Sequence, residues 1–192
     1  MMTSRAEYRL LLRQDNADLR LREKGYQIGL ISEEQYQSLL KKKQMIKEEI
    51  CRMKEHTVGA SKENQDFLIR HNSSTLKTGS NLAELVCRPE LSYDILSEID
   101  PDRPSLSADV IEQVEIEIKY EGYIERQLRQ VEQFKKMERK KIPADIDYDS
   151  VPSLRIEARQ KLKSFHPMSI GQASRISGVS PADVSVLLVY LE

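Results

Sequence analysis

The sequence predicts an all-α protein with one long helix and a C-terminal group of three short helices. Charged residues make up 32% of its 192 residues, and only 7 are glycine and 7 are proline. Such a composition is typical of long, solvated helices rather than of a turn-rich sheet protein. Apolar residues also recur at helical spacing, most clearly from Ser107 to about Lys140. A chain of this length can bury one large core or two small ones.

Local signals indicate where most of the helices start and stop. Asp15 is expected to cap the first helix and Gly29 to end it. Ser32 and Gln35 form a capping-box pattern that starts the second helix. The polar stretch 57–80 lacks helical periodicity, and we interpret it as an irregular connector. The expected helices cover residues 15–29, 32–56, 81–87, 92–99, 107–140, 153–165, 169–177 and 181–191.

Prolines suggest how the chain is divided. Pro101 and Pro104 precede the long helix and indicate a boundary between a helical subdomain at 1–106 and a second one at 107–192. Gly122 lies inside the long helix, where glycine costs about 1 kcal/mol relative to alanine. We expect an architectural reason for it, either a close approach of another backbone or packing in the core beside the neighbouring tyrosines.

Several functional classes lack support in this sequence. Nucleotide-binding glycine loops and common hydrolase or metalloprotease motifs do not occur, so no catalytic, cofactor or metal site is expected. Cys51 and Cys87 have no partner at zinc-ligand spacing, and the three histidines are scattered. No apolar run is long enough to cross a bilayer, and no signal peptide is evident. We expect a cytoplasmic protein without a membrane partner.

A concentration of arginines opens the chain. Arg5, Arg9 and Arg13 recur every four residues and would share one face of a helix, with Arg20 and Arg22 close behind. Guanidinium groups bind phosphate oxygens in a bidentate manner and stack on bases. The net charge of -1 gives no uniform attraction to nucleic acid. The charge pattern alone therefore favours a solvated basic face over an RNA contact.

The segment 169–191 resembles a helix-turn-helix with its turn at Gly178. A helix that reads DNA presents Arg, Lys, Asn or Gln to the base edges. The second helix, 181–191, contains none of these residues and is rich in Val and Leu. The pattern therefore favours a packing or docking helix, with a DNA-binding module as the alternative.

Four motifs in order resemble the C-terminal domain of the MnmG (GidA) family. They cover most of the chain, whereas the middle stretch 57–80 matches nothing in that likeness. The motifs are TSRAEYRLLLRQDNADLRL at 3–21, VEIEIKYEGYIERQ at 114–127, IPADIDY at 142–148 and SIGQASRISGVSPADVSVLLVYL at 169–191.

The resemblance implies a parent enzyme that uses FAD, with NADH as reductant. Together with the GTPase MnmE, that enzyme adds a carboxymethylaminomethyl or aminomethyl group to carbon 5 of the wobble uridine in tRNA. The resemblance also implies a homodimer that forms a heterotetramer with MnmE. Its cofactor sites and catalytic cysteines belong to the N-terminal part, so none is carried over to this sequence.

The resemblance also implies roles for two groups of residues, and it reverses the preference for a solvated basic face. The residues expected to contact tRNA are Arg5, Arg9, Arg13, Arg20 and Arg22. Those expected to contact MnmE are Arg175, Val184, Leu187 and Leu188. A stand-alone helical adaptor is the remaining alternative to a domain of a larger enzyme.

Overall fold

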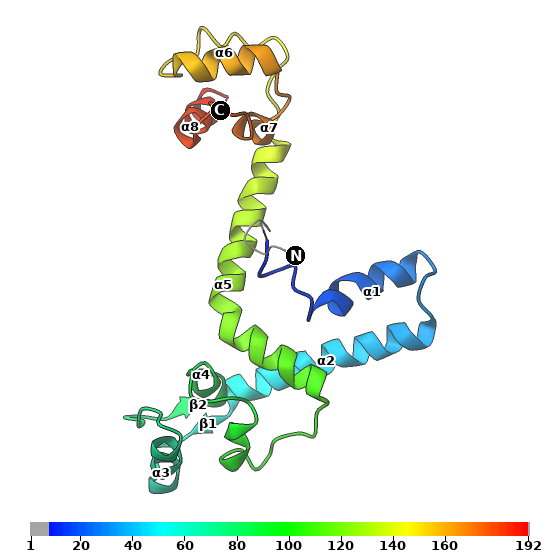
Figure 1. Ribbon diagram of the computed structural model, residues 1–192, viewed down its shortest axis with the longest axis vertical. Coiled ribbons are helices and arrows are strands. Elements are labelled where there is room, and N and C mark those ends of the chain that lie inside the picture. Colours follow the sequence, from blue (N-terminus) through cyan, green and yellow to red (C-terminus); the bar gives the residue numbers. More distant parts are fainter. Residues whose placement is uncertain (1–7, 192) are drawn as a thin grey trace. The chain divides into compact units, whose positions relative to one another are not determined.

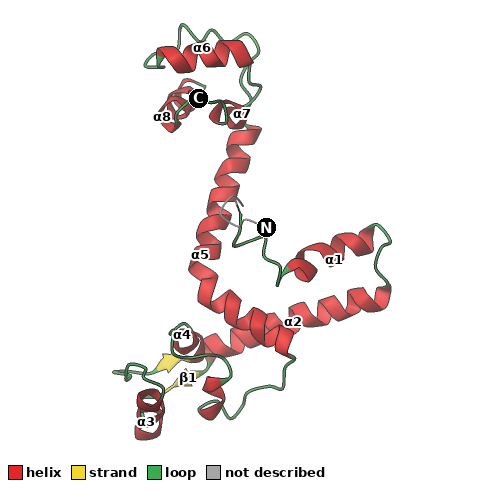
Figure 2. Cartoon of the chain, viewed as in Figure 1, coloured by secondary structure: helices red, strands yellow, loops and turns green. Residues whose placement is uncertain are grey.

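The computed structural model describes residues 8–191 and confirms the all-α prediction (Figures 1 and 2). The chain forms two compact units, Met1–Ile124 and Glu125–Glu192, called here the first and the second unit. The elements of the first unit are α1 (Ala17–Gln27), α2 (Glu33–Glu55), β1 (Thr57–Val58), α3 (Lys62–Arg70), β2 (Ser80–Asn81), α4 (Leu82–Val86) and the 3-10 turn η2 (Ile95–Glu98). The long helix α5 (Ala108–Arg139) continues into the second unit, which adds α6 (Ile156–Phe165), α7 (Ile170–Ser174) and α8 (Pro181–Tyr190).

The first two helices follow the sequence signals with one correction. The predicted capping box at Ser32 and Gln35 is present at the start of α2, which ends at Glu55. Asp15 was expected to cap α1, but Asn16 occupies the N-cap position and makes no capping hydrogen bond. The Asp15 carboxylate instead accepts a hydrogen bond from Gln113 of α5 at 3.0 Å. In place of the expected helix cap, Asp15 thus makes a long-range contact with α5 and a local one with Arg13.

The stretch 57–80 is more ordered than the predicted connector. It contains β1 and α3 and leads into β2, and Val58 pairs with Ser80 in the antiparallel register. Phe67 and Leu68 of α3 are 1% exposed. The Gln65 side-chain amide donates to the Leu76 carbonyl at 2.7 Å and its carbonyl accepts from the Leu76 amide at 3.0 Å. Burial of these few apolar side chains orders a segment whose composition is largely polar.

The remaining short segments of the first unit separate into two kinds. The helix expected at 81–87 is α4, whose Leu82, Leu85 and Val86 are fully buried. The prediction of a helix at 92–99 is wrong, because only the 3-10 turn η2 forms there. Short segments often adopt this tighter helix where few residues can form hydrogen bonds.

A buried ionic network joins these segments to α2. Glu49 and Asp100 are 2% and 4% exposed. The Arg52 guanidinium donates to both carboxylates, at 2.7 Å to Glu49 and 2.6 Å to Asp100. The Tyr93 hydroxyl donates to Glu49 at 2.8 Å. Burial and, to a smaller extent, this hydrogen bond raise the pKa of Tyr93 to about 12. The phenol therefore stays protonated and can donate at neutral pH.

The predicted long helix is present as α5, with its first turns in the core of the first unit. Val110, Val114 and Ile118 pack there and are at most 5% exposed. The boundary between the compact units therefore falls inside α5, whereas the prolines had suggested 106–107. Gly122 is exposed, and no atom from another part of the described chain lies within 4 Å of the place that a Cβ would occupy there. Neither the expected close approach nor core packing accounts for this glycine.

The second unit contains the three predicted C-terminal helices around its own core. Leu162 of α6, Ile170 of α7 and Leu187 of α8 are fully buried in it. The Ser180 hydroxyl and the Asp183 carboxylate form a capping box at the start of α8, and Pro181 occupies its first turn. These features match the sequence signals for a helix that starts at residue 181.

An ion pair connects α8 to the residue before α6. The Arg155 guanidinium donates to Asp183, 2% exposed, at 2.6 Å and to the Gly178 carbonyl at 3.0 Å. The hydrogen bond from Arg155 holds the pKa of Asp183 well below its ordinary value, although burial alone would raise it. Gly178, in the turn between α7 and α8, has a φ of 98°, which favours glycine.

Replacing Arg52 by Met is expected to destabilise the first unit by about 3–5 kcal/mol, because two buried carboxylates lose their only countercharge in the network. Urea denaturation, monitored by circular dichroism, measures the change in the free energy of unfolding. Lys54→Met is the matched control, since Lys54 lies on the same helix as Arg52. Its pair with Glu121 of α5 is about half exposed and contributes at most about 1 kcal/mol. Equal losses for both variants would contradict the role of the buried network.

Asp183 makes the stability of the second unit depend on pH. Its folded-state pKa is lowered, so its contribution is complete above the unfolded pKa of about 4 and is lost as the pH falls further. Thermal unfolding at about pH 7 and pH 3 should show a smaller acid-induced loss in Asp183→Asn than in the unaltered chain. Asp145→Asn, at an exposed position of the same unit, is the control and should retain the full loss.

Candidate functional site

The N-terminal arginines do not form the expected helical face within the described residues. Arg5 lies outside residues 8–191. Residues 8–12 form a turn, in which the amide of Leu12 donates to the Tyr8 carbonyl at 2.9 Å. The first helix starts only at Ala17, so Arg9 and Arg13 are not successive positions on one helix.

Two of these arginines hold the segment together from within. The Arg13 guanidinium donates to Asp15 at 3.0 Å and to the Leu10 carbonyl at 2.7 Å. Arg20 donates to the Asn16 side chain at 2.8 Å and to the Arg13 carbonyl at 3.1 Å. Two of the three guanidinium nitrogens of each arginine donate in this way, and both side chains are partly buried. Arg13 and Arg20 therefore shape the loop before α1.

Arg9 and Arg22 are in a different situation. Both are exposed, and neither forms an ion pair or a side-chain hydrogen bond within residues 8–191. Their guanidinium groups are available for an anion from outside this chain. Of the arginines predicted to bind tRNA, these two are the ones that are exposed and unpaired within residues 8–191.

The predicted partner-binding residues also separate into two groups. Val184 is 7% exposed and Leu187 is fully buried, so both belong to the core of the second unit rather than to its surface. Leu188 is half-buried, and its carbonyl accepts a hydrogen bond from the Lys140 ammonium at 3.2 Å. Arg175 is exposed, pairs with Glu138 and lies 5.7 Å from the centre of the Phe134 ring. Val184 and Leu187 pack α8 against this core and do not lie on the exposed surface of the helix.

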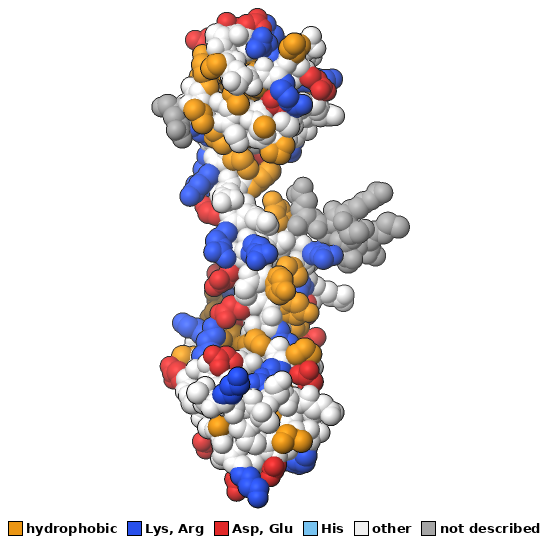
Figure 3. Space-filling view, turned by 90° about the vertical axis from the view of Figure 1, so that its left-hand side faces the viewer, with side chains coloured by type: hydrophobic (Ala, Val, Ile, Leu, Met, Phe, Trp, Pro, Cys, Tyr) orange, Lys and Arg blue, Asp and Glu red, His pale blue; other side chains and the backbone are white. Residues whose placement is uncertain are grey.

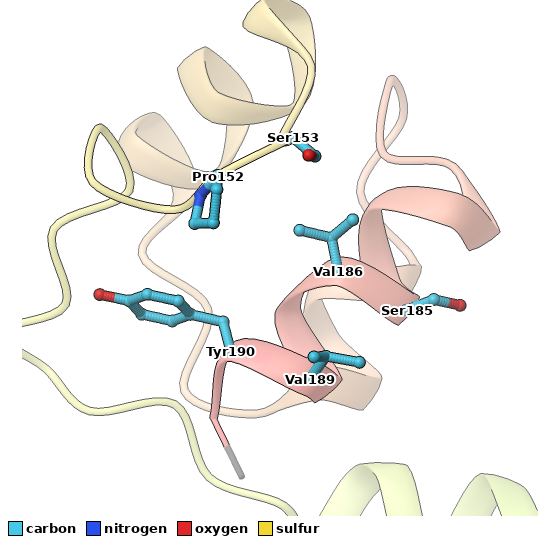
Figure 4. Close-up of a pocket in the computed structure, with 6 residues that line it drawn as sticks. All are labelled: Pro152, Ser153, Ser185, Val186, Val189 and Tyr190. Atoms are coloured by element: carbon cyan, nitrogen blue, oxygen red, sulfur yellow. The ribbon is translucent and has the colours of Figure 1, made fainter.

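A shallow apolar groove lies on the exposed side of α8. It has a volume of about 610 Å³, and Figure 4 shows Pro152 and Ser153 opposite the residues of α8 across it. Val189 and Tyr190 are 73% and 44% exposed, although both are large and apolar. The residues that line the groove are Pro152, Ser153, Ser185, Val186, Val189 and Tyr190.

The sequence motifs did not predict this groove, although the composition of the helix carries a signal for it. The helix 181–190 has apolar residues on nearly all sides, which is more than one core can cover. A surplus of apolar positions on a short helix of a small unit indicates a second contact surface. The sequence alone does not say which of the two faces is buried.

The described residues offer little for chemistry. No group of His, Cys, Asp and Glu side chains in residues 8–191 is arranged to hold a metal ion. Cys51 and Cys87 are free, and their pKa values are raised, by the hydrogen bond to Glu55 for Cys51 and by burial for Cys87. A raised pKa makes a thiol a poorer nucleophile. No helix in this part of the chain combines the length and apolar character of a membrane span.

Family models match the chain from residue 33 onward in two parts. Residues 33–128 match the model of the tRNA modifying enzyme MnmG/GidA C-terminal helical domain. Residues 130–192 match that of the tRNA modifying enzyme MnmG/GidA C-terminal helical bundle. The two matches meet inside α5, close to the boundary of the compact units.

Individual relatives agree with these matches. The chain is 63% identical over 192 residues to the tRNA uridine 5-carboxymethylaminomethyl modification enzyme MnmG of Caldicellulosiruptor saccharolyticus, and 64% identical to that of Lachnoclostridium phytofermentans. It spans 31% of the length of each relative.

Solved structures show the same fold. GidA of Aquifex aeolicus in its form II crystal is 41% identical, with a TM-score of 0.67 over 97% of this chain and 29% of that one. In its form I crystal, the same protein is 42% identical to this chain, with a TM-score of 0.65 over 99% of this chain and 28% of that one. With two matching family models, these likenesses establish that the chain belongs to the MnmG/GidA family of tRNA-modifying enzymes, as its C-terminal helical region.

Proposed function

We propose that this chain is the tRNA-binding and partner-binding domain of an FAD-dependent enzyme that modifies the wobble uridine of tRNA. With the GTPase MnmE, the enzyme adds a carboxymethylaminomethyl or aminomethyl group to carbon 5 of that base, using NADH as reductant. The observation that carries the proposal is the 63–64% identity over the whole chain to enzymes named for tRNA uridine 5-carboxymethylaminomethyl modification. We assign the flavin, NADH and catalytic chemistry, as well as the homodimer contact, to the part of the parent outside this chain.

The tRNA contacts are assigned first to the N-terminal arginines. Arg9 and Arg22 are exposed and unpaired among the described residues, so they contact phosphate groups directly, as does Arg5 by the family likeness. Arg13 and Arg20 act as positioning residues, because their hydrogen bonds fix the loop that carries Arg9. Phosphate contacts of this kind set the position of an RNA without reading its sequence.

The contact with MnmE is assigned to the groove on α8. Exposed Val189 and Tyr190 offer apolar and aromatic area, which is enriched in the centres of protein interfaces. Arg175 and Leu188 remain candidate contacts in the same unit. The heterotetramer then consists of a homodimer of the parent with MnmE bound through the second unit of each chain.

A DNA-binding role for the C-terminal helices has less support. The exposed residues of α8 lie within a sequence that contains no Arg, Lys, Asn or Gln. Specific contacts in the major groove depend on such side chains. A gel shift comparing tRNA with duplex DNA separates this alternative from the proposal.

The double variant Arg9→Gln, Arg22→Gln is expected to bind tRNA more weakly in the full-length protein. Each lost phosphate contact removes about 0.7–0.9 from the slope of log affinity against log salt, so the slope should become shallower by about 1.5. Filter binding of tRNA over a series of salt concentrations measures both the affinity and this slope. Lys62→Gln with Lys77→Gln removes the same charge from exposed positions in the same unit, and an equal effect there would contradict a local contact.

Val189→Glu is expected to weaken the complex with MnmE at least about tenfold, because a carboxylate would be buried in an apolar contact. Isothermal titration calorimetry with purified MnmE measures the affinity. Ile156→Glu is the matched control, since Ile156 is also 73% exposed in the second unit but does not line the groove. Unchanged affinity of the Val189 variant would place the docking surface elsewhere.

A further inference from the structure

The second half of α5 carries a row of cations that the sequence motifs did not single out. Arg126, Arg129, Gln133 and Lys136 follow one another at spacings of three, four and three residues, so they lie on one face of the helix. All four are exposed. We call this row the α5 stripe. It contains no carboxylate and no apolar residue.

The cations of the stripe have no partners in the described part of this chain. Arg126, Arg129 and Lys136 form neither an ion pair nor a side-chain hydrogen bond within residues 8–191. Glu125 and Glu132 flank the stripe, but Glu132 pairs with Lys135 at 3.7 Å and neither carboxylate pairs with the stripe. The cations of the stripe are therefore unpaired within residues 8–191, although Glu125 and Glu132 lie one turn before Arg129 and Lys136.

Other cations of the chain show the contrast. Lys42 pairs with Asp18 at 2.9 Å and with Asp109 at 2.8 Å, and Arg52 pairs with two carboxylates. In the middle of the view of Figure 3, Lys and Arg side chains lie among Asp, Glu and hydrophobic ones. Like charges that recur on one helical face destabilise an isolated helix slightly. An external polyanion would remove that repulsion.

The dimensions of the stripe suit a sugar-phosphate backbone. Ten residues separate Arg126 from Lys136, which places them about 15 Å apart along the axis at a rise of about 1.5 Å per residue. A row of this length meets several phosphates of one RNA. Guanidinium, ammonium and amide groups are the side chains that commonly bind phosphate and ribose oxygens.

Gly122 extends the same face by one turn. It lies four residues before Arg126, is exposed and has no packing neighbour among the described residues within 4 Å of its Cβ position. A turn without a side chain lets a ligand backbone approach the helix closely. This accounts for a glycine that nothing in the described chain packs against.

We propose that the α5 stripe, with Gly122, binds the sugar-phosphate backbone of tRNA and forms a second contact surface besides the N-terminal arginines. The inference rests on the proposed tRNA-binding function. A lipid surface or a protein partner is less well suited, because both contacts need apolar area beside the charge. The four residues of the stripe are polar, and the exposed Tyr123 and Leu128 lie on neighbouring faces of α5 rather than within the row.

The test is tRNA binding by full-length protein carrying Arg126→Gln, Arg129→Gln and Lys136→Gln together. The expected result is weaker binding and a salt slope shallower by about two, from about 0.7 for each of three lost contacts. The control triple Lys41→Gln, Lys62→Gln, Lys77→Gln removes the same charge from exposed positions of the first unit. Circular dichroism and thermal unfolding establish that both triples fold.

The outcomes separate this inference from the function on which it rests. If the unaltered protein binds tRNA and the stripe variant keeps its affinity and slope, the α5 stripe is not a contact and the proposed function stands. If the unaltered protein does not bind tRNA, both fail. Equal effects of the two triple variants would show that the loss comes from the change in overall charge rather than from a local contact. That result would overturn the proposal for the α5 stripe. Gly122→Gln should lower affinity severalfold without changing the salt slope, and unchanged affinity would overturn the part assigned to Gly122.

Discussion

The first unit depends on the single guanidinium that neutralises two buried carboxylates. Glu49 and Asp100 are almost fully buried, and a carboxylate removed from water must be paired. Arg52 pairs with both, which fixes the segment around Asp100 against α2. That segment in turn contacts α5, since the Tyr93 amide donates to Glu115 and Lys119 donates to the Leu91 carbonyl. The start of α5 is therefore positioned through Arg52.

This anchoring explains the unusual exposure of the middle of α5. Its first turns are held in the core of the first unit, and Met137 near its end packs against the core of the second. The turns from Glu121 to Gln130 are mostly exposed and must remain helical without burial. Straight-chain charged residues suit such a segment because they lose little rotamer freedom in a helix. The same exposure leaves the cations of the α5 stripe accessible.

The sequence predicted what depends on local or periodic signals. The capping box at Ser32 and Gln35 and the extent of α5 are of this kind, and so is the all-α class. The strands β1 and β2 have two residues each, which is too short to show a period. The pairing of Arg13 inside its own loop depends on side-chain geometry that spacing does not encode. Because α8 is apolar on nearly all sides, its sequence could not show that Val184 is buried and that Val189 is exposed.

Net charge is a poor guide to this chain because its charges are unevenly divided. Residues 1–124 carry 18 Lys and Arg against 22 Asp and Glu, whereas residues 125–192 carry 12 against 9. A net charge of -1 thus conceals an acidic first unit and a basic second unit. An RNA backbone is repelled by most of the first unit and attracted where cations are exposed and unpaired. Under the proposed function, the exposed cations without a partner in the described residues would determine where tRNA binds, since a paired cation attracts phosphate less strongly.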